Sequence, residues 1–218
     1  MSRAADAVRR VIDVMVGGLG VVVLAPVWIV VAVVVRVRLG SPVLFRQRRL
    51  GRGGAPFELL KFRTMLPPKP GREGSEFDAE RLPAVGRCLR STSLDELPSF
   101  VNLLRGEITL VGPRPLPVQY WDRYTTTQLR RLEVKPGITG LAQVAGRNAV
   151  DWPQRLALDV EYVERRSLSL DAHIVLRTIP VVFGRRGVDH AQGVTMHELP
   201  IQHDTEMRHD TDGMTNGR

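Results

Sequence analysis

The sequence is poor in several features that would define its class. Its single cysteine, Cys88, excludes an intramolecular disulfide and suits a reducing compartment. Aromatic residues make up only 6% of the 218 residues, which is low for a module that stacks nucleic-acid bases. Acidic residues are outnumbered, and the formal net charge is +8. We therefore expect an anionic partner such as nucleic acid, anionic lipid or a phosphorylated small molecule.

The one long apolar run lies near the N-terminus. Residues 14–35, VMVGGLGVVVLAPVWIVVAVVV, contain no charge and are long enough for a single transmembrane helix. Two features favour another interpretation. Pro26 in the middle removes a backbone hydrogen bond and kinks a helix. Basic residues flank both ends, whereas a true span should carry them mainly on its cytoplasmic side. We therefore predict that residues 1–40 form a re-entrant anchor whose helix is broken at Ala25-Pro26.

The remaining pattern predicts an α+β fold that is mainly α. Residues 43–65 indicate two short strands around the turn at 51–54, and a helix that ends at Gly106 is expected after the stretch STSLDELPSF. Residues 154–183 predict two amphipathic helices divided near Ser167. Residues 120–134 suit either a helix at a membrane surface or a helix packed on a soluble core.

We assign residues 41–187 to a compact catalytic domain with helices at the membrane interface. Residues 188–218 are polar and are expected to be disordered. The histidines of this tail have irregular spacing, so a metal site there is not expected.

Asp95 and Glu96, in the stretch STSLDELPSF, are adjacent carboxylates just before a proline. The simplest interpretation is a capping box in which Ser93 begins a helix. That start would place Pro98 inside the helix, where it removes a needed amide. A start at Leu97 or Pro98 avoids the conflict and leaves both carboxylates at the helix mouth, a place that attracts anions. A phosphate group can bind at the same place as these two carboxylates only if a divalent cation or several arginines neutralise the negative charge.

Several cationic residues lie near the pair in sequence or in neighbouring segments, some of them in loops framed by glycine and proline. They are Lys61, Arg63, Arg87, Arg90, Arg114, Lys135 and Arg147. Each alone is typical of a solvated surface. Together with the two carboxylates they predict a metal-assisted phosphoryl-transfer site. Magnesium (Mg2+), with manganese as an alternative, would be held by Glu96 and Asp95, because it accepts one or two carboxylates plus phosphate oxygens.

Three blocks of this sequence resemble the bacterial sugar transferase family, the small monotopic phosphoglycosyl transferases. They are SPVLFRQRRLGRGGAPFELLKFRTM, LRSTSLDELPSFVNLLRGEITLVGPRPLP and KPGITGLAQVAGRN. The similarity runs from about residue 8 to 185. It implies transfer of a sugar-1-phosphate from a UDP-sugar to a membrane polyprenol phosphate, with release of UMP. The expected location is the cytoplasmic face of the bacterial inner membrane, among its lipids.

The resemblance also implies residue roles. Asp95 would attack the phosphorus that carries the sugar and form an acyl phosphate, and Glu96 would help to hold magnesium. Arg90 and Arg147 match positions expected to contact phosphate, and Lys61, Arg63 and Arg114 would extend the same cationic wall. Asp171 matches an acidic residue that recurs in the family, and the resemblance does not assign a role to it. The family usually has serine before the proline, where this chain has Ala25.

The competing hypothesis is a membrane-anchored basic scaffold without catalysis. It explains the charge and the anchor but not the carboxylate pair among arginines, and no nucleic-acid-binding motif is recognisable. A phosphatase that lets water attack the acyl phosphate is a third alternative. A homodimer is possible. The sequence does not identify the sugar, the downstream glycan or the polyprenol length.

Overall fold

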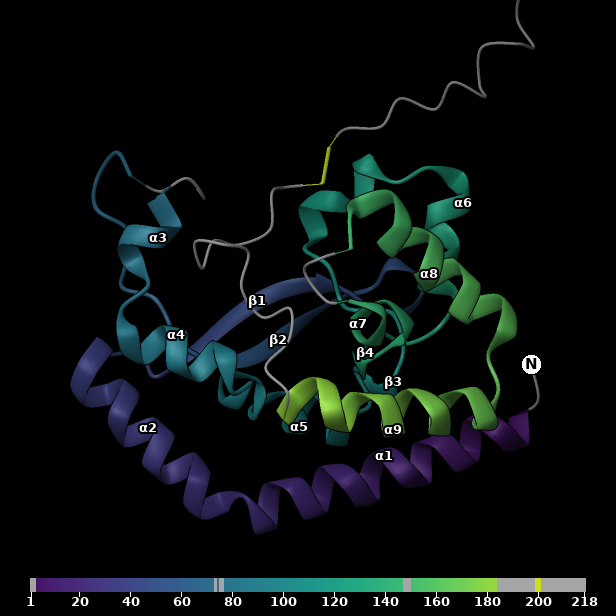
Figure 1. The fold of residues 1–218 in the computed structure, drawn as a ribbon, viewed down its shortest axis with the longest axis horizontal. Coiled ribbons are helices and arrows are strands. Elements are labelled where there is room, and N and C mark those ends of the chain that lie inside the picture. The colour runs from purple at the N-terminus through teal and green to yellow at the C-terminus, as the bar shows by residue number, and fades with distance from the viewer. Residues whose placement is uncertain (1–2, 73, 75–76, 147–149, 184–198, 201–218) are drawn as a thin grey trace, which may run out of the picture.

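The computed structural model describes residues 3–72, 74, 77–146, 150–183 and 199–200. It is mainly helical, with two small two-stranded sheets, in agreement with the predicted α+β class. The long helices α1 (Arg3–Val23) and α2 (Ala25–Leu39) run along the lower edge of the molecule, with α9 (Leu168–Phe183) above α1 (Figure 1). The other elements lie on one side of this pair.

The predicted break in the N-terminal helix is confirmed. The axes of α1 and α2 are bent by 63° at Leu24, and Pro26 lies in the first turn of α2. A proline is tolerated there because the first amides of a helix have no partner within it. In the part of the chain that the structure describes, no single helix could cross a membrane, and only the bent pair together has the required length and composition.

Helix α1 has its polar and small residues on the inside. Arg9, Asp13 and Gly17 are buried at spacings of four residues and therefore share one face. Asp13 accepts hydrogen bonds from the Leu110 amide at 2.7 Å and from Thr109 Oγ1 at 3.1 Å. Gly17 allows close packing, since a Cβ atom there would lie 3.0 Å from the Leu104 side chain. The predicted anchor is thus part of the same packed body as the catalytic residues.

The outer faces of α1 and α2 are apolar. Met15, Leu19 and Val22 on α1 are 66–73% exposed, and Ile29 and Val37 on α2 are 65% and 74% exposed. A helix on the surface of a water-soluble domain normally shows the reverse pattern. A contiguous exposed apolar surface of this kind marks a membrane or protein contact.

The predicted hairpin is present. Strand β1 (Leu44–Leu50) pairs antiparallel with β2 (Pro56–Phe62), across the turn that contains the short helix η1 (Arg52–Gly54). The hairpin is joined to helix α5 (Ser99–Arg105) by the buried side chain of Asn102. Its Oδ1 accepts from the Leu60 amide at 3.0 Å, and its Nδ2 donates to the Glu58 carbonyl at 2.7 Å. This clamp fixes β2 against the element that follows the carboxylate pair.

A second sheet was not predicted. Strands β3 (Thr109–Val111) and β4 (Gly137–Thr139) form a short parallel pair. Their backbones approach so closely that a Cβ atom on Gly137 would lie 2.1 Å from the Gly112 amide nitrogen. This glycine of the KPGITGLAQVAGRN block is therefore required by backbone packing. The pair brings the loops around residues 114 and 138 to one place.

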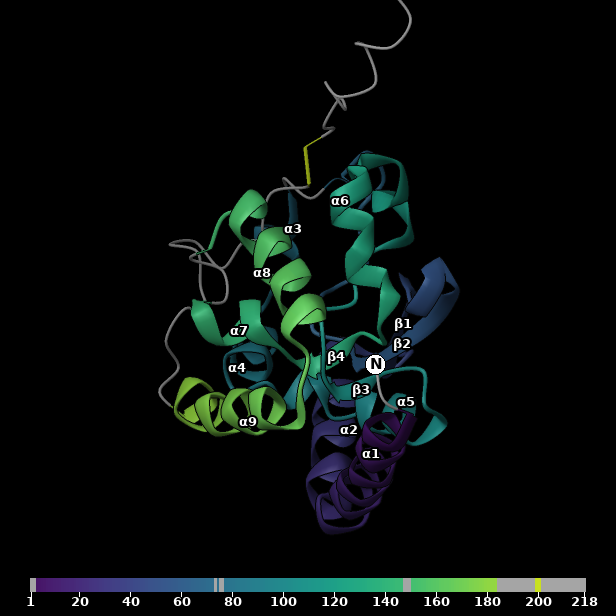
Figure 2. The ribbon, with the colours of Figure 1, turned by 90° about the vertical axis from the view of Figure 1, so that its right-hand side faces the viewer.

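Residues 120–134 form three short helices. They are η4 (Val118–Arg123), α6 (Thr126–Leu129) and η5 (Arg130–Glu133). Thr125 begins α6 with a capping box in which it exchanges hydrogen bonds with Gln128. Tyr124 and Leu132 are buried in a core cluster, and α6 lies at the end of the molecule opposite α1 and α2 in both views (Figures 1 and 2). The segment is therefore three short helices packed on the core and not a single helix, and its contact with a membrane surface stays a prediction.

The last helices agree with the sequence. Helix α8 (Trp152–Arg165) and α9 are separated at residues 166–167, as predicted from the pattern near Ser167. The tail at 188–218 lies outside the described residues except for Leu199 and Pro200. The Leu199 side chain is fully buried in the same cluster as Tyr124 and Leu132, and its carbonyl accepts from Arg123 at 2.6 Å. Leu199 thus packs on the catalytic body, and the expected disorder of the tail stays a prediction. The short helices α3 (Asp78–Arg81), α4 (Ala84–Ser91) and α7 (Leu141–Ala145) complete the described part.

Candidate active site

The carboxylate pair lies in a short turn before helix α5. Asp95 and Glu96 belong to the 3-10 turn η3 (Leu94–Glu96), and α5 begins at Ser99 with Pro98 as its N-cap. Ser93 has a left-handed backbone and its side chain makes no capping hydrogen bond. The capping box is therefore absent, and the helix starts close to the predicted position. The helix ends at Gly106, whose left-handed conformation is typical of a C-cap.

One carboxylate oxygen of Glu96 forms ion pairs with two cationic side chains. Lys61 Nζ lies 2.6 Å and Arg114 Nη2 lies 2.8 Å from Glu96 Oε1. Burial acts to raise the pKa of Glu96, but Arg114 and Lys61 outweigh it and hold this pKa well below its usual range. Glu96 is thus a carboxylate at all physiological pH values.

The pKa of Asp95 is shifted in the opposite direction to that of Glu96. Only 7% of its surface is exposed, and burial raises its pKa to about 6, against the attraction of Lys61. The neighbouring Glu96 carboxylate raises the pKa further, while Arg90 and Arg114 lower it. Two adjacent carboxyl groups with pKa values shifted in opposite directions are typical of an active site. At neutral pH Asp95 is mainly a poorly solvated carboxylate, a reactive form of the group.

The loop that carries Arg114 is held by a buried ion pair. Arg131 in η5 donates from Nε and Nη2 to Asp159 Oδ2 on α8, at 3.0 and 2.7 Å. The same Nη2 donates to the backbone carbonyl of Arg114 at 2.6 Å. The position of the Arg114 guanidinium beside Glu96 therefore depends on two residues that pattern analysis did not single out.

The other predicted cations are distributed over different places. Arg90 on α4 is near enough to Asp95 to affect its pKa, and its Nε donates to Thr64 Oγ1 at 3.0 Å. Arg63 donates to the backbone carbonyls of Leu39 and Ser41, at the end of α2, so its guanidinium is engaged away from Glu96. Arg147 lies outside the described residues.

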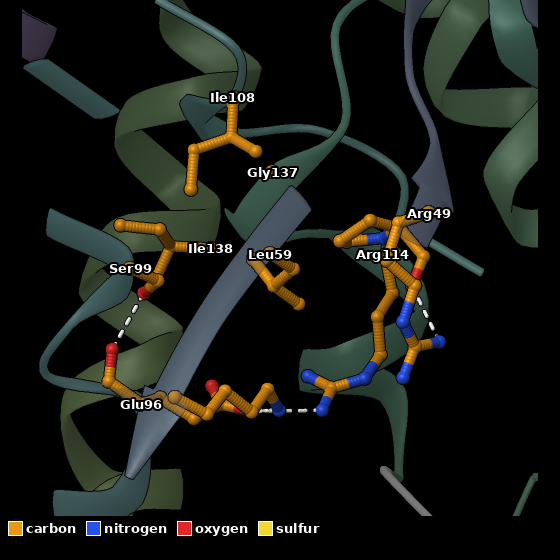
Figure 3. Close-up of a pocket in the computed structure, with 10 residues that line it drawn as sticks. Arg49, Leu59, Glu96, Ser99, Ile108, Arg114, Gly137 and Ile138 are labelled. Atoms are coloured by element: carbon orange, nitrogen blue, oxygen red, sulfur yellow. Dashed lines mark hydrogen bonds and ion pairs between the residues drawn. The ribbon is translucent and has the colours of Figure 1, made fainter. Parts of the chain in front are cut away.

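One cation of the site was missed. Arg49 on β1 lines the same depression as Lys61, Glu96 and Arg114, and Figure 3 shows it beside Arg114. The sequence signal was available, because residues 47 and 49 share a strand face that differs from that of residues 46 and 48.

The structure gives Asp171 a set of contacts. Its carboxylate accepts from Arg9 Nε on α1 at 2.7 Å and from the Tyr162 hydroxyl on α8 at 2.7 Å. Arg166 adds an ion pair with Asp6 at 2.9 Å. These contacts tie the start of α1 to the last two helices. Asp171 thus fixes the apolar helix pair to the catalytic body.

The site contains two carboxylates that could contribute to binding a divalent cation. Among the described residues, no group of three or more His, Cys, Asp or Glu side chains could hold a metal ion by itself. The two carboxylates fit magnesium only if substrate phosphate oxygens complete its coordination, which is the usual way that this ion is bound. Both protein cations bind Oε1 of Glu96, and Glu96 and Asp95 would be the residues that hold the metal.

Comparison with known proteins agrees with this geometry. The family model described as bacterial sugar transferase matches residues 4–185. The chain belongs to the bacterial sugar transferase family. It is therefore a transferase enzyme, which decides against the scaffold hypothesis.

Individual relatives are similar over most of this chain. It is 47% identical over 162 residues to the sugar transferase EpsL of Bacillus subtilis, covering 74% of this chain and 80% of the relative. It is 41% identical over 187 residues to the UDP-glucose:undecaprenyl-phosphate glucose-1-phosphate transferase of Caulobacter vibrioides, covering 81% and 70%. It is 35% identical over 202 residues to the undecaprenyl-phosphate galactose phosphotransferase of Salmonella typhimurium, covering 85% and 42%.

Proposed function

We propose that this sugar transferase moves a sugar-1-phosphate from a UDP-sugar to a polyprenol phosphate of the undecaprenyl type and releases UMP. The names of the relatives from Caulobacter vibrioides and Salmonella typhimurium support this donor and acceptor class. The observation that carries the proposal is the environment of Asp95, a buried carboxylate beside a second carboxylate that two cations neutralise. The exposed apolar faces of α1 and α2 support action at a membrane surface.

In the first step, an Asp95 oxygen attacks the phosphorus that bears the sugar. The bond from this phosphorus to the bridging oxygen breaks, and UMP leaves with the electron pair. Lys61 and Arg114 hold Glu96 ionised beside the reacting group and supply positive charge for the phosphate oxygens. A magnesium ion bound at Glu96 and Asp95 would neutralise further charge on the diphosphate.

In the second step, an oxygen of the polyprenol phosphate attacks the same phosphorus. The bond between phosphorus and Asp95 breaks, which restores the carboxylate and gives a polyprenyl-diphosphate sugar. Dividing the transfer in this way lets a water-soluble donor and a lipid acceptor use one site in turn. The apolar helix pair would hold the site at the cytoplasmic face of the inner membrane, with α1 and α2 re-entrant.

The test is a donor reaction without acceptor, using the full chain in nanodiscs, magnesium, and UDP-glucose or UDP-galactose. We expect a burst of about one UMP per chain and a sugar-phosphate mass increase on the peptide that contains Asp95. Asp95→Asn should give neither, while the exposed control Asp122→Asn should behave as the parent chain. When polyprenol phosphate is then added in a second reaction, lipid-linked sugar formed without any earlier adduct or UMP burst would contradict the covalent step. Free sugar phosphate in place of lipid-linked sugar would indicate the phosphatase alternative.

A further inference from the structure

Arg49 is a half-buried cation of the active-site depression, and its hydrogen-bond partners among the described residues are neutral. Its Nη1 donates to the Pro115 carbonyl at 3.1 Å, and its Nη2 donates to Gln47 Oε1 at 2.5 Å. Among the described residues, none of the ion pairs includes Arg49, although Glu96 in the same depression pairs with Lys61 and Arg114. The charge of this guanidinium is therefore not compensated by a direct contact with a carboxylate.

One atom of Arg49 also lacks any partner. Its Nε is buried and makes no hydrogen bond within the described part of the chain. Buried polar atoms are normally hydrogen-bonded, because an unpaired buried donor is costly. Burial lowers the pKa of Arg49 to about 10, and repulsion from Arg114 contributes to this shift. An anion bound between Arg49 and Arg114 would offset the repulsion between the two guanidinium groups.

The position of Arg49 relative to the carboxylates indicates which anion fits. In Figure 3, Arg114 reaches toward Glu96, and Arg49 lies on the far side of Arg114 from Glu96. A phosphorus attacked by Asp95 has to lie near the carboxylate pair. A diphosphate that extends from that pair past Arg114 would place its second phosphorus beside Arg49. Two neighbouring guanidinium groups suit the adjacent phosphates of a diphosphate, since each presents a planar fork of donors.

We propose that Arg49 binds the phosphate that leaves with the nucleoside, an inference that rests on the proposed function. Arg114 then lies between the two phosphates of the donor. Arg49 stabilises the negative charge that develops on the leaving phosphate as the bond to the sugar-bearing phosphorus breaks.

The experiment measures equilibrium binding of UDP and of uridine to the full chain in nanodiscs, for the parent chain and three variants. Arg49→Gln should weaken UDP binding at least tenfold, as expected for loss of charge-assisted hydrogen bonds, and Arg49→Lys should weaken it less. Uridine binding should be unchanged, because uridine carries no phosphate. Arg46→Gln is the matched control, since Arg46 lies on the opposite face of the same strand with a 65% exposed side chain.

Each outcome decides the inference. Unchanged UDP affinity in Arg49→Gln would overturn it. An equal loss of UDP and uridine affinity, or a large drop in melting temperature, would show that Arg49 acts only on the fold of the site and would also overturn it. A parent chain that binds UDP no more tightly than uridine would do the same. If UDP binding depends on Arg49 but no donor gives UMP release, the phosphate site stands and the proposed transfer fails.

Discussion

Arg131 holds the loop that carries Arg114, because its Nη2 donates to the backbone carbonyl of Arg114 at 2.6 Å. Arg131 is itself fixed by Asp159, and the two side chains are only 1% and 2% exposed. Through this chain of contacts, helix α8 positions a guanidinium that reaches Glu96. Burying two charges is costly, and the pair is tolerated because each charge has a direct partner.

Asp159→Ala should therefore destabilise the protein by about 3–5 kcal/mol, because it leaves the Arg131 charge buried without its partner. The double variant Arg131→Met with Asp159→Leu should recover much of this loss, since no buried charge remains. Glu161→Ala is the control on the same helix. It removes an exposed ion pair with Arg165 and should cost about 0.5 kcal/mol or less. Denaturant unfolding of the detergent-held protein measures each change, and equal effects of Asp159→Ala and Glu161→Ala would contradict the role.

Asp95 should titrate near pH 6 in metal-free protein, because burial and the neighbouring Glu96 raise its pKa to about 6. An infrared band of a protonated carboxyl should grow as the pH falls through this value and should be missing in Asp95→Asn. The unfolded chain loses the same proton near pH 4, so this group makes the fold less stable as the pH rises from about 4 to about 6. A band that appears only near pH 4 would show that the environment does not raise the pKa.

Magnesium should lower the pH at which Asp95 titrates. A cation bound by both carboxylates competes with the proton, so the midpoint of the infrared titration should fall when magnesium is added. UDP should strengthen this effect, since its phosphate oxygens complete the coordination. Glu96→Gln should abolish the shift, and chelation should restore the midpoint of the parent chain. A midpoint that magnesium and UDP leave unchanged would exclude the metal from this carboxylate pair.

Local signals in the sequence predicted much of the fold and part of the site. Pro26 fixes the bend because a proline cannot continue the preceding hydrogen-bond pattern, and Pro98 excludes a helix start at Ser93 for the same reason. The hairpin follows from two short strand-like segments on either side of a glycine-rich turn. The break of residues 120–134 was also readable, because Thr125 and Gln128 have capping-box spacing.

Other features depend on partners that are distant in the sequence. Arg131 and Asp159 are 28 residues apart, and neither has a local pattern that distinguishes a buried pair from two surface charges. Asn102 joins α5 to β2 across 42 residues, and the strands of the parallel pair have three residues each, too few to show a period. Arg63 and Arg114 look alike in sequence, but the first binds carbonyls of the anchor and the second binds Glu96. Tertiary packing therefore decides which arginines stabilise the fold and which contribute to the active site.

The apolar outer faces of α1 and α2 lead to the last prediction. On α1, Asp13 is 3% exposed whereas Leu19 is 66% exposed, which is the reverse of a water-facing helix. This arrangement is stable in water only at the cost of the exposed apolar area, and a lipid environment removes that cost.

Leu19→Asp should therefore weaken attachment to lipid vesicles by at least tenfold, because moving one leucine side chain out of an apolar environment costs about 1.5–3 kcal/mol and a charge in lipid costs more. Flotation of the full chain with vesicles measures the bound fraction. The control is Trp121→Asp, since Trp121 is also apolar and 43% exposed but belongs to η4, next to α6 at the opposite end of the molecule. Equal loss of flotation in both variants would show that the apolar faces of α1 and α2 are not the lipid-binding surface.

The re-entrant arrangement of α1 and α2 has a separate test. Reporters fused to either end of the chain should both lie on the cytoplasmic side if α1 and α2 enter and leave the same leaflet. Reporters on opposite sides of the membrane would instead indicate a single span.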